Sequence, residues 1–321
     1  MTRYRHALPQ LSNDIFLTDG GIETTLIFHQ GLALPCFAAF DLLSSHKGRQ
    51  QLREYYAPYL DLAVTAKRGL ILESPTWRAN ADWGDQLGYN SHDLAQSNQA
   101  AIELMQDLRN EFDRFEQARS QQARSQQAMV ISGCVGPRGD GYRPTHVMDS
   151  ESARQYHSQQ IQTFADTQAD MVTAITMNYV QEAIGITLAA QDANMPVVIS
   201  FTTETDGRLP SGDTLQAAIQ AVDKATNNGP AYYMINCAHP DHFASVLQEK
   251  EDWVQRIKGL RANASRCSHA ELDEADSLDE GCPSEFGQLY AELRQRLPHI
   301  NVLGGCCGTD ARHIRAVSNY C

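Results

Sequence analysis

The stretch INVLGGCCGTDARHIRAVS, at residues 300–318, shows the unit from which the fold is built. Its first residues are apolar and favour a β-strand, its middle is a glycine-rich turn, and residues 312–318 have helical spacing. A buried strand that passes through a short turn into a helix is the repeating unit of α/β proteins. This stretch therefore predicts an α/β fold with parallel strands.

The same order of strand, turn and helix recurs along the chain. Short apolar runs that end in turn residues predict eight strands, at 15–18, 69–73, 129–134, 171–176, 196–201, 231–236, 257–262 and 300–304. Helical patterns follow at 49–66, 92–116, 152–168, 180–193, 214–226, 240–246, 284–297 and 312–318. Eight repeats favour a closed (β/α)8 TIM barrel over an open sheet. A Gly-x-Gly-x-x-Gly turn is missing after the first strand, which disfavours a dinucleotide-binding fold.

Length and composition fit one soluble domain. The 321 residues are 42% hydrophobic, which is enough for one large core, so we predict a single barrel domain over residues 1–321. The net charge of −13 argues against nucleic acid as a partner. A secretion signal or membrane-spanning run is not apparent, so we predict a cytoplasmic protein with reduced cysteines and no membrane partner. Whether it forms a homo-oligomer stays open.

Two segments interrupt the barrel pattern. Residues 118–128 read ARSQQARSQQA, a polar tandem repeat that we interpret as a solvated helix extension or loop insertion without chemistry. Residues 266–281 are rich in Asp and Glu and follow the seventh predicted strand. We expect them to form a long loop on the top face of the barrel, which is either a plain surface loop or a lid over a substrate.

Three cysteines stand where predicted strands end, which is where barrel enzymes carry their chemistry. Cys306 and Cys307 are adjacent within a glycine-rich turn, and Cys237 ends another strand in the run INCAHP. A turn with positive φ at glycine can aim neighbouring sulfurs at one ion. Three thiolates suit Zn²⁺ and leave one coordination position open, as in catalytic sites. The alternatives are three reduced, buried cysteines, and His239 as either a fourth ligand or a pocket or surface histidine.

Five runs of sequence indicate a family. They are TDGGIETTL at 18–26, GPRGDGY at 136–142, VVISFTTETDGRL at 197–209, INCAHP at 235–240 and VLGGCCGTDARHI at 302–314. With these runs the chain resembles the homocysteine S-methyltransferase family over nearly its whole length. The resemblance implies a (β/α)8 barrel that binds Zn²⁺ through Cys237, Cys306 and Cys307. It also implies that Asp19 and Gly20 bind homocysteine.

The substrate-binding residues are predicted partly from chemistry and partly from this resemblance. The Asp19 carboxylate can pair with an ammonium group, and the amides of Gly20 and Gly21 can receive a carboxylate. The family usually has a glutamate near the end of the fourth strand, where this chain has Thr176. Glu73, which ends the second predicted strand, is our candidate for the missing carboxylate.

Together these features predict a zinc-dependent S-methyltransferase. It would move a methyl group from a sulfonium or similar donor to the thiolate of homocysteine, forming methionine, so its partners would be a small-molecule thiol and a methyl donor. One alternative is a methyltransferase for a different thiol. Others are a zinc-dependent hydrolase or lyase, which would more often show His and Asp ligands, and a non-catalytic zinc protein with four protein ligands.

Overall fold

The computed structural model describes residues 2–119, 127–145, 147–247 and 251–321. Its strands form a closed parallel barrel in which each strand pairs with its neighbour in sequence and β8 closes onto β1. The strands are β1 Phe16–Leu17, β2 Gly69–Glu73, β3 Met129–Val135, β4 Met171–Met177, β5 Val197–Thr202, β6 Tyr232–Asn236, β7 Ile257–Ala262 and β8 Val302–Gly305. The predicted (β/α)8 TIM barrel is therefore confirmed.

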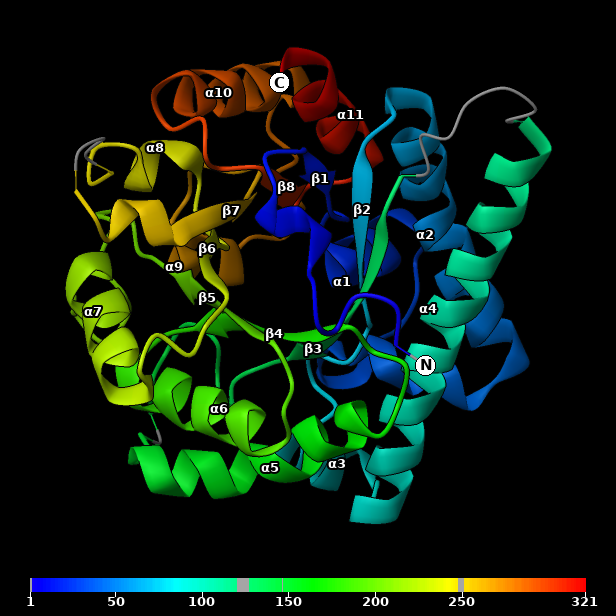
Figure 1. The fold of residues 1–321 in the computed structure, drawn as a ribbon, viewed down its shortest axis with the longest axis horizontal. Helices are drawn as coiled ribbons and strands as arrows, with labels where there is room; N and C mark the ends of the chain where they lie inside the picture. The colour runs from blue at the N-terminus through cyan, green and yellow to red at the C-terminus, as the bar shows by residue number, and fades with distance from the viewer. Residues whose placement is uncertain (1, 120–126, 146, 248–250) are drawn as a thin grey trace.

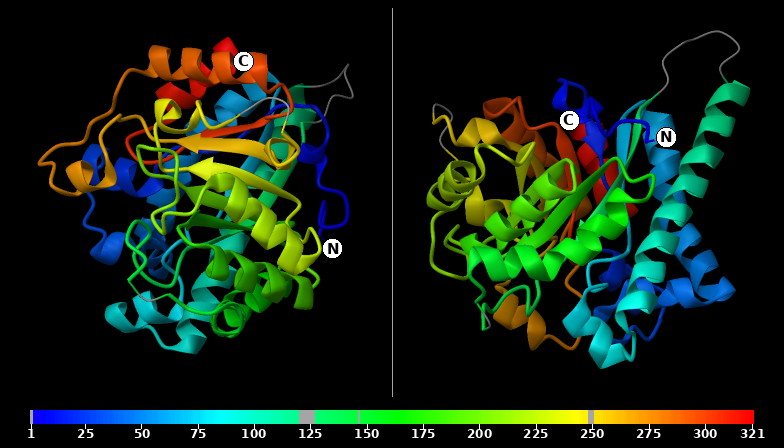
Figure 2. Two further views of the ribbon diagram at one scale, coloured as in Figure 1. Left: turned by 90° about the vertical axis from the view of Figure 1, so that its left-hand side faces the viewer. Right: turned by 60° about the horizontal axis from the view of Figure 1, so that its bottom comes forward.

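Helices surround the barrel on all sides (Figure 1). They are α1 Ile22–Thr24, α2 His46–Ala66, α3 Ala81–Leu87, α4 Ser91–Arg119, α5 Ser150–Ala165, α6 Val180–Asp192, α7 Leu215–Thr226, α8 Pro240–Phe243, α9 His269–Asp273, α10 Pro283–Arg296 and α11 Ala311–Tyr320. Each predicted helix overlaps one of these. The sequence pattern missed the short helices α1, α3 and α9, and α9 lies inside the segment expected to be either a plain surface loop or a lid. The long α4 runs along the outside of the barrel (Figure 2).

Helix α2 shows how the outer layer supports the barrel mouth. The Ser45 side chain accepts a hydrogen bond from the Gly48 amide and so caps the start of the helix, and left-handed Lys67 ends it. Its inward face buries Tyr55 and Tyr59, among other apolar residues. Four residues apart, these two tyrosines lie on one side of the helix and reach the turn that follows β1.

The amino-terminal end of the barrel is filled with apolar side chains. Residues from seven strands, all except β7, pack there with Leu8, which precedes the barrel. Gln10 lies beneath them, and its amide donates to the Met171 sulfur at 3.1 Å and to the Tyr232 hydroxyl at 3.4 Å. The cluster consists of Leu8, Phe16, Ile71, Val130, Met171, Val198, Tyr232, Met234 and Val302. This end of the barrel is a packed core.

The structure also bears on the predicted insertion and on the expected lack of a membrane-spanning run. The insertion predicted at 118–128 begins at the end of α4, and residues 120–126 lie outside the described residues. Among the helices of the described segments, none combines the length and apolar character needed to cross a membrane.

Candidate metal centre and substrate pocket

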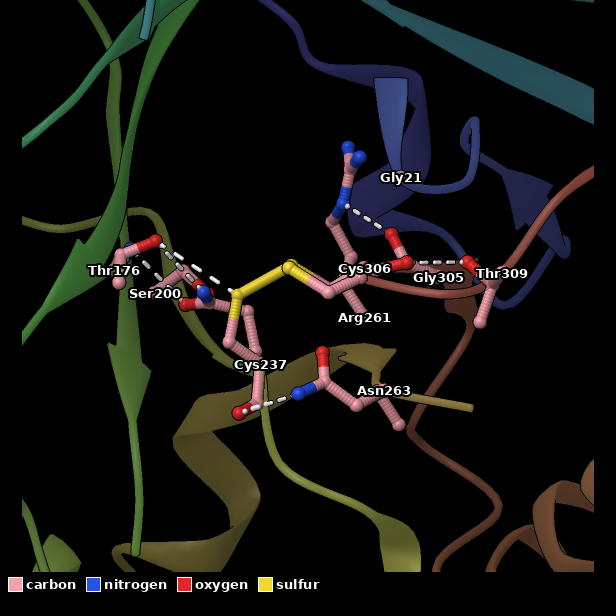
Figure 3. The surroundings of a disulfide bond; sticks show 12 residues. Gly21, Thr176, Ser200, Cys237, Arg261, Asn263, Gly305, Cys306 and Thr309 are labelled. Carbon is pink, nitrogen blue, oxygen red and sulfur yellow. Dashed lines mark hydrogen bonds between the residues drawn. A yellow bond between two sulfur atoms is a disulfide. The ribbon is translucent and has the colours of Figure 1, made fainter. Parts of the chain in front are cut away.

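Three cysteines meet at the carboxyl-terminal mouth of the barrel. Cys237 follows β6, and Cys306 and Cys307 follow β8, and their sulfur atoms all lie within 4.8 Å of one another. Cys237 and Cys306 are joined as a disulfide (Figure 3). Cys307 is a free thiol. The expectation that every cysteine is reduced is therefore wrong at this pair. Sulfurs placed closely enough to share an ion are also close enough to bond with each other.

The backbone conformation at the cysteines differs from the predicted glycine turn with positive φ. Gly304 and Gly305 belong to strand β8, and only Gly308 in this loop has a positive φ, of 76°. The two strand glycines are needed for space, because a Cβ atom would collide with the Thr18 or Thr309 side chain. Cys237 itself is left-handed, with φ of 55°. Such a conformation is uncommon for a non-glycine residue and often marks a functional position.

The loop that carries Cys237 is held from three sides. Thr176 at the end of β4 is also left-handed, with φ of 67°, and its hydroxyl lies 3.9 Å from the Cys237 sulfur. Asn236 bonds to the Thr176 amide and hydroxyl, both at 3.1 Å. The Cys237 carbonyl accepts hydrogen bonds from Asn263 at 3.1 Å and from the His269 ring at 2.5 Å. His269 begins α9, so the acidic loop contacts the cysteine site directly.

The loop that carries the other two cysteines is fixed by its own hydrogen bonds. The Thr309 amide and hydroxyl donate to the Cys306 carbonyl at 3.1 and 2.7 Å. The Tyr142 hydroxyl lies 3.7 Å from the Cys307 sulfur. Burial raises the pKa of the Cys307 thiol to about 11. A neighbouring cation is therefore needed to keep this sulfur as a thiolate at neutral pH.

His239 has a structural role. Its Nδ1 atom accepts a hydrogen bond from the Asp241 amide at 3.2 Å and caps the start of α8. Burial lowers the pKa of His239 to about 4, so the ring is neutral at pH 7. Across the described ranges, the cluster of possible metal ligands contains the three cysteines and not this histidine. His239 is thus a buried helix cap, neither a ligand nor a surface residue.

One pocket contains all of the predicted site residues. It is lined by the cysteines, by Trp77 and Tyr142, and by the ionisable residues Glu23 and Arg261. It is also lined by the predicted substrate-binding residues, which are Asp19, Gly20, Gly21, Glu73 and Thr176. Residues at or just beyond the ends of seven strands, all except β5, therefore converge at the same mouth.

The glycine amides differ from the prediction, because they are already hydrogen-bonded within the protein. The Gly21 amide donates to the Thr309 carbonyl at 3.0 Å, and the Gly20 amide bonds to the Tyr59 hydroxyl. A Cβ atom on Gly20 would lie 2.7 Å from that Thr309 oxygen, and one on Gly21 would lie 2.6 Å from the Cys306 carbonyl oxygen. These glycines let the first turn pack against the cysteine loop, and their amides do not face a substrate carboxylate.

Asp19 also has partners within the protein. One carboxylate oxygen accepts from Arg261 at 2.7 Å, and the other accepts from the Tyr55 hydroxyl at 2.9 Å. Both members of this ion pair are buried. Asp19 is therefore not a free counter-charge for an ammonium group, as the sequence suggested. Arg261 was missed, although a charged residue inside the apolar run 257–262 was a signal that could have revealed it.

Glu73 is the less satisfied carboxylate of the pocket. It is 4% exposed, and its Oε2 atom has no hydrogen-bond partner among the described residues. Burial raises the pKa of Glu73 to about 7, against the opposing influence of Arg261. Burial likewise raises the pKa of Glu23 to about 7. Perturbed carboxyl groups that converge in one pocket are typical of functional sites.

Fold and site together define a TIM-barrel protein with a cluster of three cysteines, which are possible metal ligands, at the carboxyl-terminal mouth of the barrel. The sequence profile of the homocysteine S-methyltransferase family matches residues 16–321, and the chain belongs to that family. This membership confirms the resemblance seen in the sequence. It also confirms the predicted class of enzyme, a methyltransferase that acts on the homocysteine thiol.

Individual relatives are distant in sequence but similar along their whole length. Homocysteine S-methyltransferase 1 of Brassica oleracea var. italica is 21% identical, with 94% of this chain and 92% of the relative aligned. The metallated form of the Escherichia coli homocysteine methyltransferase MmuM superposes with a TM-score of 0.72 at 18% identity, covering 96% of each chain. Its oxidized form gives a TM-score of 0.74, covering 99% of this chain and 100% of that one. These superpositions show a shared fold.

Proposed function

We propose that this protein moves a methyl group from a small sulfonium donor to the sulfur of homocysteine, at Zn²⁺ held by Cys237, Cys306 and Cys307. The observation that carries the proposal is the meeting of three cysteine sulfurs within 4.8 Å at the mouth of the barrel. Tetrahedral Zn²⁺ with bonds of about 2.3 Å needs sulfur atoms roughly 4 Å apart. The donor set therefore fits zinc, and the reduced form of the cysteine pair would be the one that binds it.

A metal is chemically useful here because a free thiol is a poor nucleophile at neutral pH. With a pKa near 8.5, only about 3% of a free thiol is thiolate at pH 7. Zn²⁺ held by Cys237, Cys306 and Cys307 would leave one coordination position open and would lower the pKa of an acceptor thiol placed there. Around that position, Thr176 and Tyr142 lie against the sulfurs of Cys237 and Cys307. We assign them the role of fixing the cysteines and shaping the pocket.

Methyl transfer from a sulfonium donor to a thiolate needs no further reactant. The acceptor thiolate attacks the methyl carbon, a new carbon–sulfur bond forms, and the bond to the donor sulfur breaks. The electron pair of that bond leaves with the donor, which becomes a neutral thioether. Glu23 lines the pocket and acts electrostatically on Cys307, so its carboxylate is suited to attract a cationic donor to the reacting end.

The acceptor's ammonium group needs a counter-charge that Asp19 does not offer. Glu73 provides it, since its Oε2 atom is buried at the pocket wall without a partner. It would take the place of the glutamate that the family usually carries where Thr176 stands in this chain. A different thiol is the main alternative acceptor, because this replacement alters the pocket. The partners are thus a small thiol and a methyl donor, and we propose a cytoplasmic location, where thiols stay reduced.

Two other functions are less well supported. A zinc hydrolase or lyase would more often have His and Asp ligands, and the described residues place only cysteines at the cluster. A structural zinc site would have four protein ligands, whereas the described part of the chain brings together three.

The test removes one metal ligand. Cys307→Ala should lose most of its bound zinc and lower methyl transfer to homocysteine by at least roughly 100-fold, because even outer-shell changes at metal sites cost 10- to 100-fold. Zinc is measured by elemental analysis of reduced protein, and transfer by methionine formation. Cys267→Ala, at an exposed cysteine away from the cluster, is the matched control and should behave as wild type. A Cys307→Ala protein with full zinc and full activity would refute the proposal.

A further inference from the structure

Arg261 presents an unused hydrogen-bond donor at the pocket wall. It lies in β7, and its side chain extends from beside Cys306 toward the turn at Gly21 (Figure 3). Its Nη2 atom donates to Asp19 at 2.7 Å and to the Gly20 carbonyl at 3.3 Å, and its Nε atom donates to Gly305 at 3.2 Å. Its Nη1 atom is buried and has no hydrogen-bond partner among the described residues.

A buried, charged hydrogen-bond donor without a partner, such as Nη1 of Arg261, is unusual. Buried polar groups are almost always hydrogen-bonded, and leaving one unpaired is costly. Arg261 is 5% exposed, and it lines the same pocket as the three cysteines. The guanidinium fork can serve two anions at once, since its nitrogens are separate donors in one plane. With Asp19 on Nη2, the Nη1 atom remains available for a second anion.

Other receptors for an anion are already engaged. The amides of Gly20 and Gly21 bond within the protein, to Tyr59 and Thr309. Arg261 is the one Arg, Lys or His among the described residues that line this pocket. An anionic group of a bound molecule therefore has a single cationic side chain to meet there.

Glu73 gives the pocket a matching site of opposite sign. Its Oε2 atom is buried and without a partner, in the same way as Nη1 of Arg261. The two residues come from β2 and β7 and interact electrostatically, but no ion pair joins them in the structure as described. An α-amino acid carries an ammonium and a carboxylate on one carbon. It would satisfy both orphan atoms together.

We propose that Arg261 binds the α-carboxylate of the acceptor through Nη1, while Glu73 binds its ammonium. Arg261 thereby restricts the acceptor to thiols that carry an α-amino-acid group. The proposal rests on the function proposed above, and it adds the residue that selects the acceptor's charged end. Asp19 and Tyr55 then have a positioning role, because their hydrogen bonds fix the plane of the Arg261 guanidinium.

The test compares three thiols that differ by one charged group. Homocysteine has both groups, 3-aminopropane-1-thiol lacks the carboxylate, and 4-mercaptobutanoate lacks the ammonium. Arg261→Lys keeps a charge for Asp19 but loses the second donor. Its preference for homocysteine over the aminothiol, as the ratio of kcat/KM values, should fall by about 10- to 100-fold. Its kcat/KM for the aminothiol should stay near that of wild type.

Two variants serve as controls for this comparison. Arg266→Lys changes an exposed arginine just beyond β7 and should leave every ratio unchanged. Glu73→Gln should instead lower the preference for homocysteine over 4-mercaptobutanoate, and leave the preference over the aminothiol intact. If Arg261→Lys does not fold, the neutral double variant D19N/R261Q removes the ion pair as a unit and should show the same loss of preference.

A binding measurement separates failure of this proposal from failure of the proposed function. Wild type that transfers no methyl group to any of the three thiols would refute the function. Calorimetric titration with methionine and with 3-(methylthio)propan-1-amine then still tests Arg261, because only methionine has the carboxylate. A wild type with equal affinity for both, or an active Arg261→Lys that keeps its full preference for homocysteine, would overturn the assignment.

Discussion

The amino-terminal mouth of the barrel is filled by apolar side chains, whereas the carboxyl-terminal mouth gathers four ionisable side chains and three cysteines. At the amino-terminal end, Phe16, Met171 and Tyr232 pack against Leu8 in one apolar cluster. At the carboxyl-terminal end, Asp19, Glu73 and Arg261 are buried together. The same strands thus stabilise the protein at one end and hold its chemistry at the other. This division is expected for a barrel whose loops at one face vary with function.

The largest expected effect is a loss of stability when the apolar cluster at the amino-terminal mouth is disrupted. Phe16→Ala should lower the free energy of unfolding by about 3–5 kcal/mol, because Phe16 is 2% exposed and its ring fills the barrel end above Gly69. The KM for homocysteine should not change, since the pocket is at the opposite end. Urea unfolding and steady-state kinetics measure the two quantities. Phe28→Ala, at a phenylalanine that is 48% exposed, should shift stability by less than about 0.5 kcal/mol.

A strong rise in KM for Phe16→Ala would break the comparison, because it would mean that the two ends are energetically coupled.

An intermediate effect is expected at the carboxyl-terminal mouth, where the ionisation of Glu73 should make stability depend on pH. Burial raises the pKa of Glu73 from 4.5 to about 7, so the folded state holds a proton that the unfolded chain releases between these values. Stability from that proton is fully present below about pH 4.5 and is lost as the pH rises through 7. Glu73→Gln should therefore be more stable than wild type at pH 8, by up to about 3 kcal/mol, and similar to it at pH 4.5.

The measurement is urea unfolding of metal-free, reduced protein at the two pH values. Glu23 titrates in the same range, but it is present in both proteins and cancels in the difference. An equal stability difference at both pH values would show that the Glu73 carboxylate is not desolvated.

The smallest expected effect concerns backbone strain at Thr176, in the carboxyl-terminal mouth. Thr176 is a β-branched residue with φ of 67°, a conformation that glycine adopts without penalty. Thr176→Gly relieves that strain but loses the hydrogen bond to Asn236 and adds freedom to the unfolded chain. The net change in unfolding free energy should be within about 1 kcal/mol. Thr176→Val keeps the strain and loses the bond, so calorimetry should show it to be the less stable of the two.

The sequence predicted the architecture well because it depends on periodic, local features. The runs 69–73 and 257–262 match β2 and β7 residue for residue, and the other strands shift by one or two positions. The cysteine cluster was also predictable, because strand ends converge in a barrel. What the sequence did not reveal depends on contacts between distant residues. Examples are the Asp19–Arg261 ion pair and the hydrogen bond from the Gly21 amide to Thr309.

Helix α9 is a second example of a feature that the sequence did not reveal. The short helix α9 was expected to be loop, because its five residues are too few for a periodic pattern. Its role depends on His269, which contacts Tyr142 with ring centroids 4.1 Å apart and reaches the Cys237 carbonyl. Neither contact has a local signal in the sequence.

The three cysteines come from strands β6 and β8, and Arg261 comes from β7 between them. Three adjacent strands, β6 to β8, therefore position the cysteines that we propose as zinc ligands and the arginine that we propose to bind the acceptor's carboxylate. Glu73 ends β2, Glu23 follows β1 and Tyr142 follows β3, and all three line the same pocket. Glu23, the residue proposed to attract the donor, lies in the short helix α1, whereas Glu73 and Arg261, the residues proposed to hold the acceptor, lie in strands. Exchanging α1 between relatives would therefore retarget the methyl donor while the acceptor contacts are inherited with the barrel.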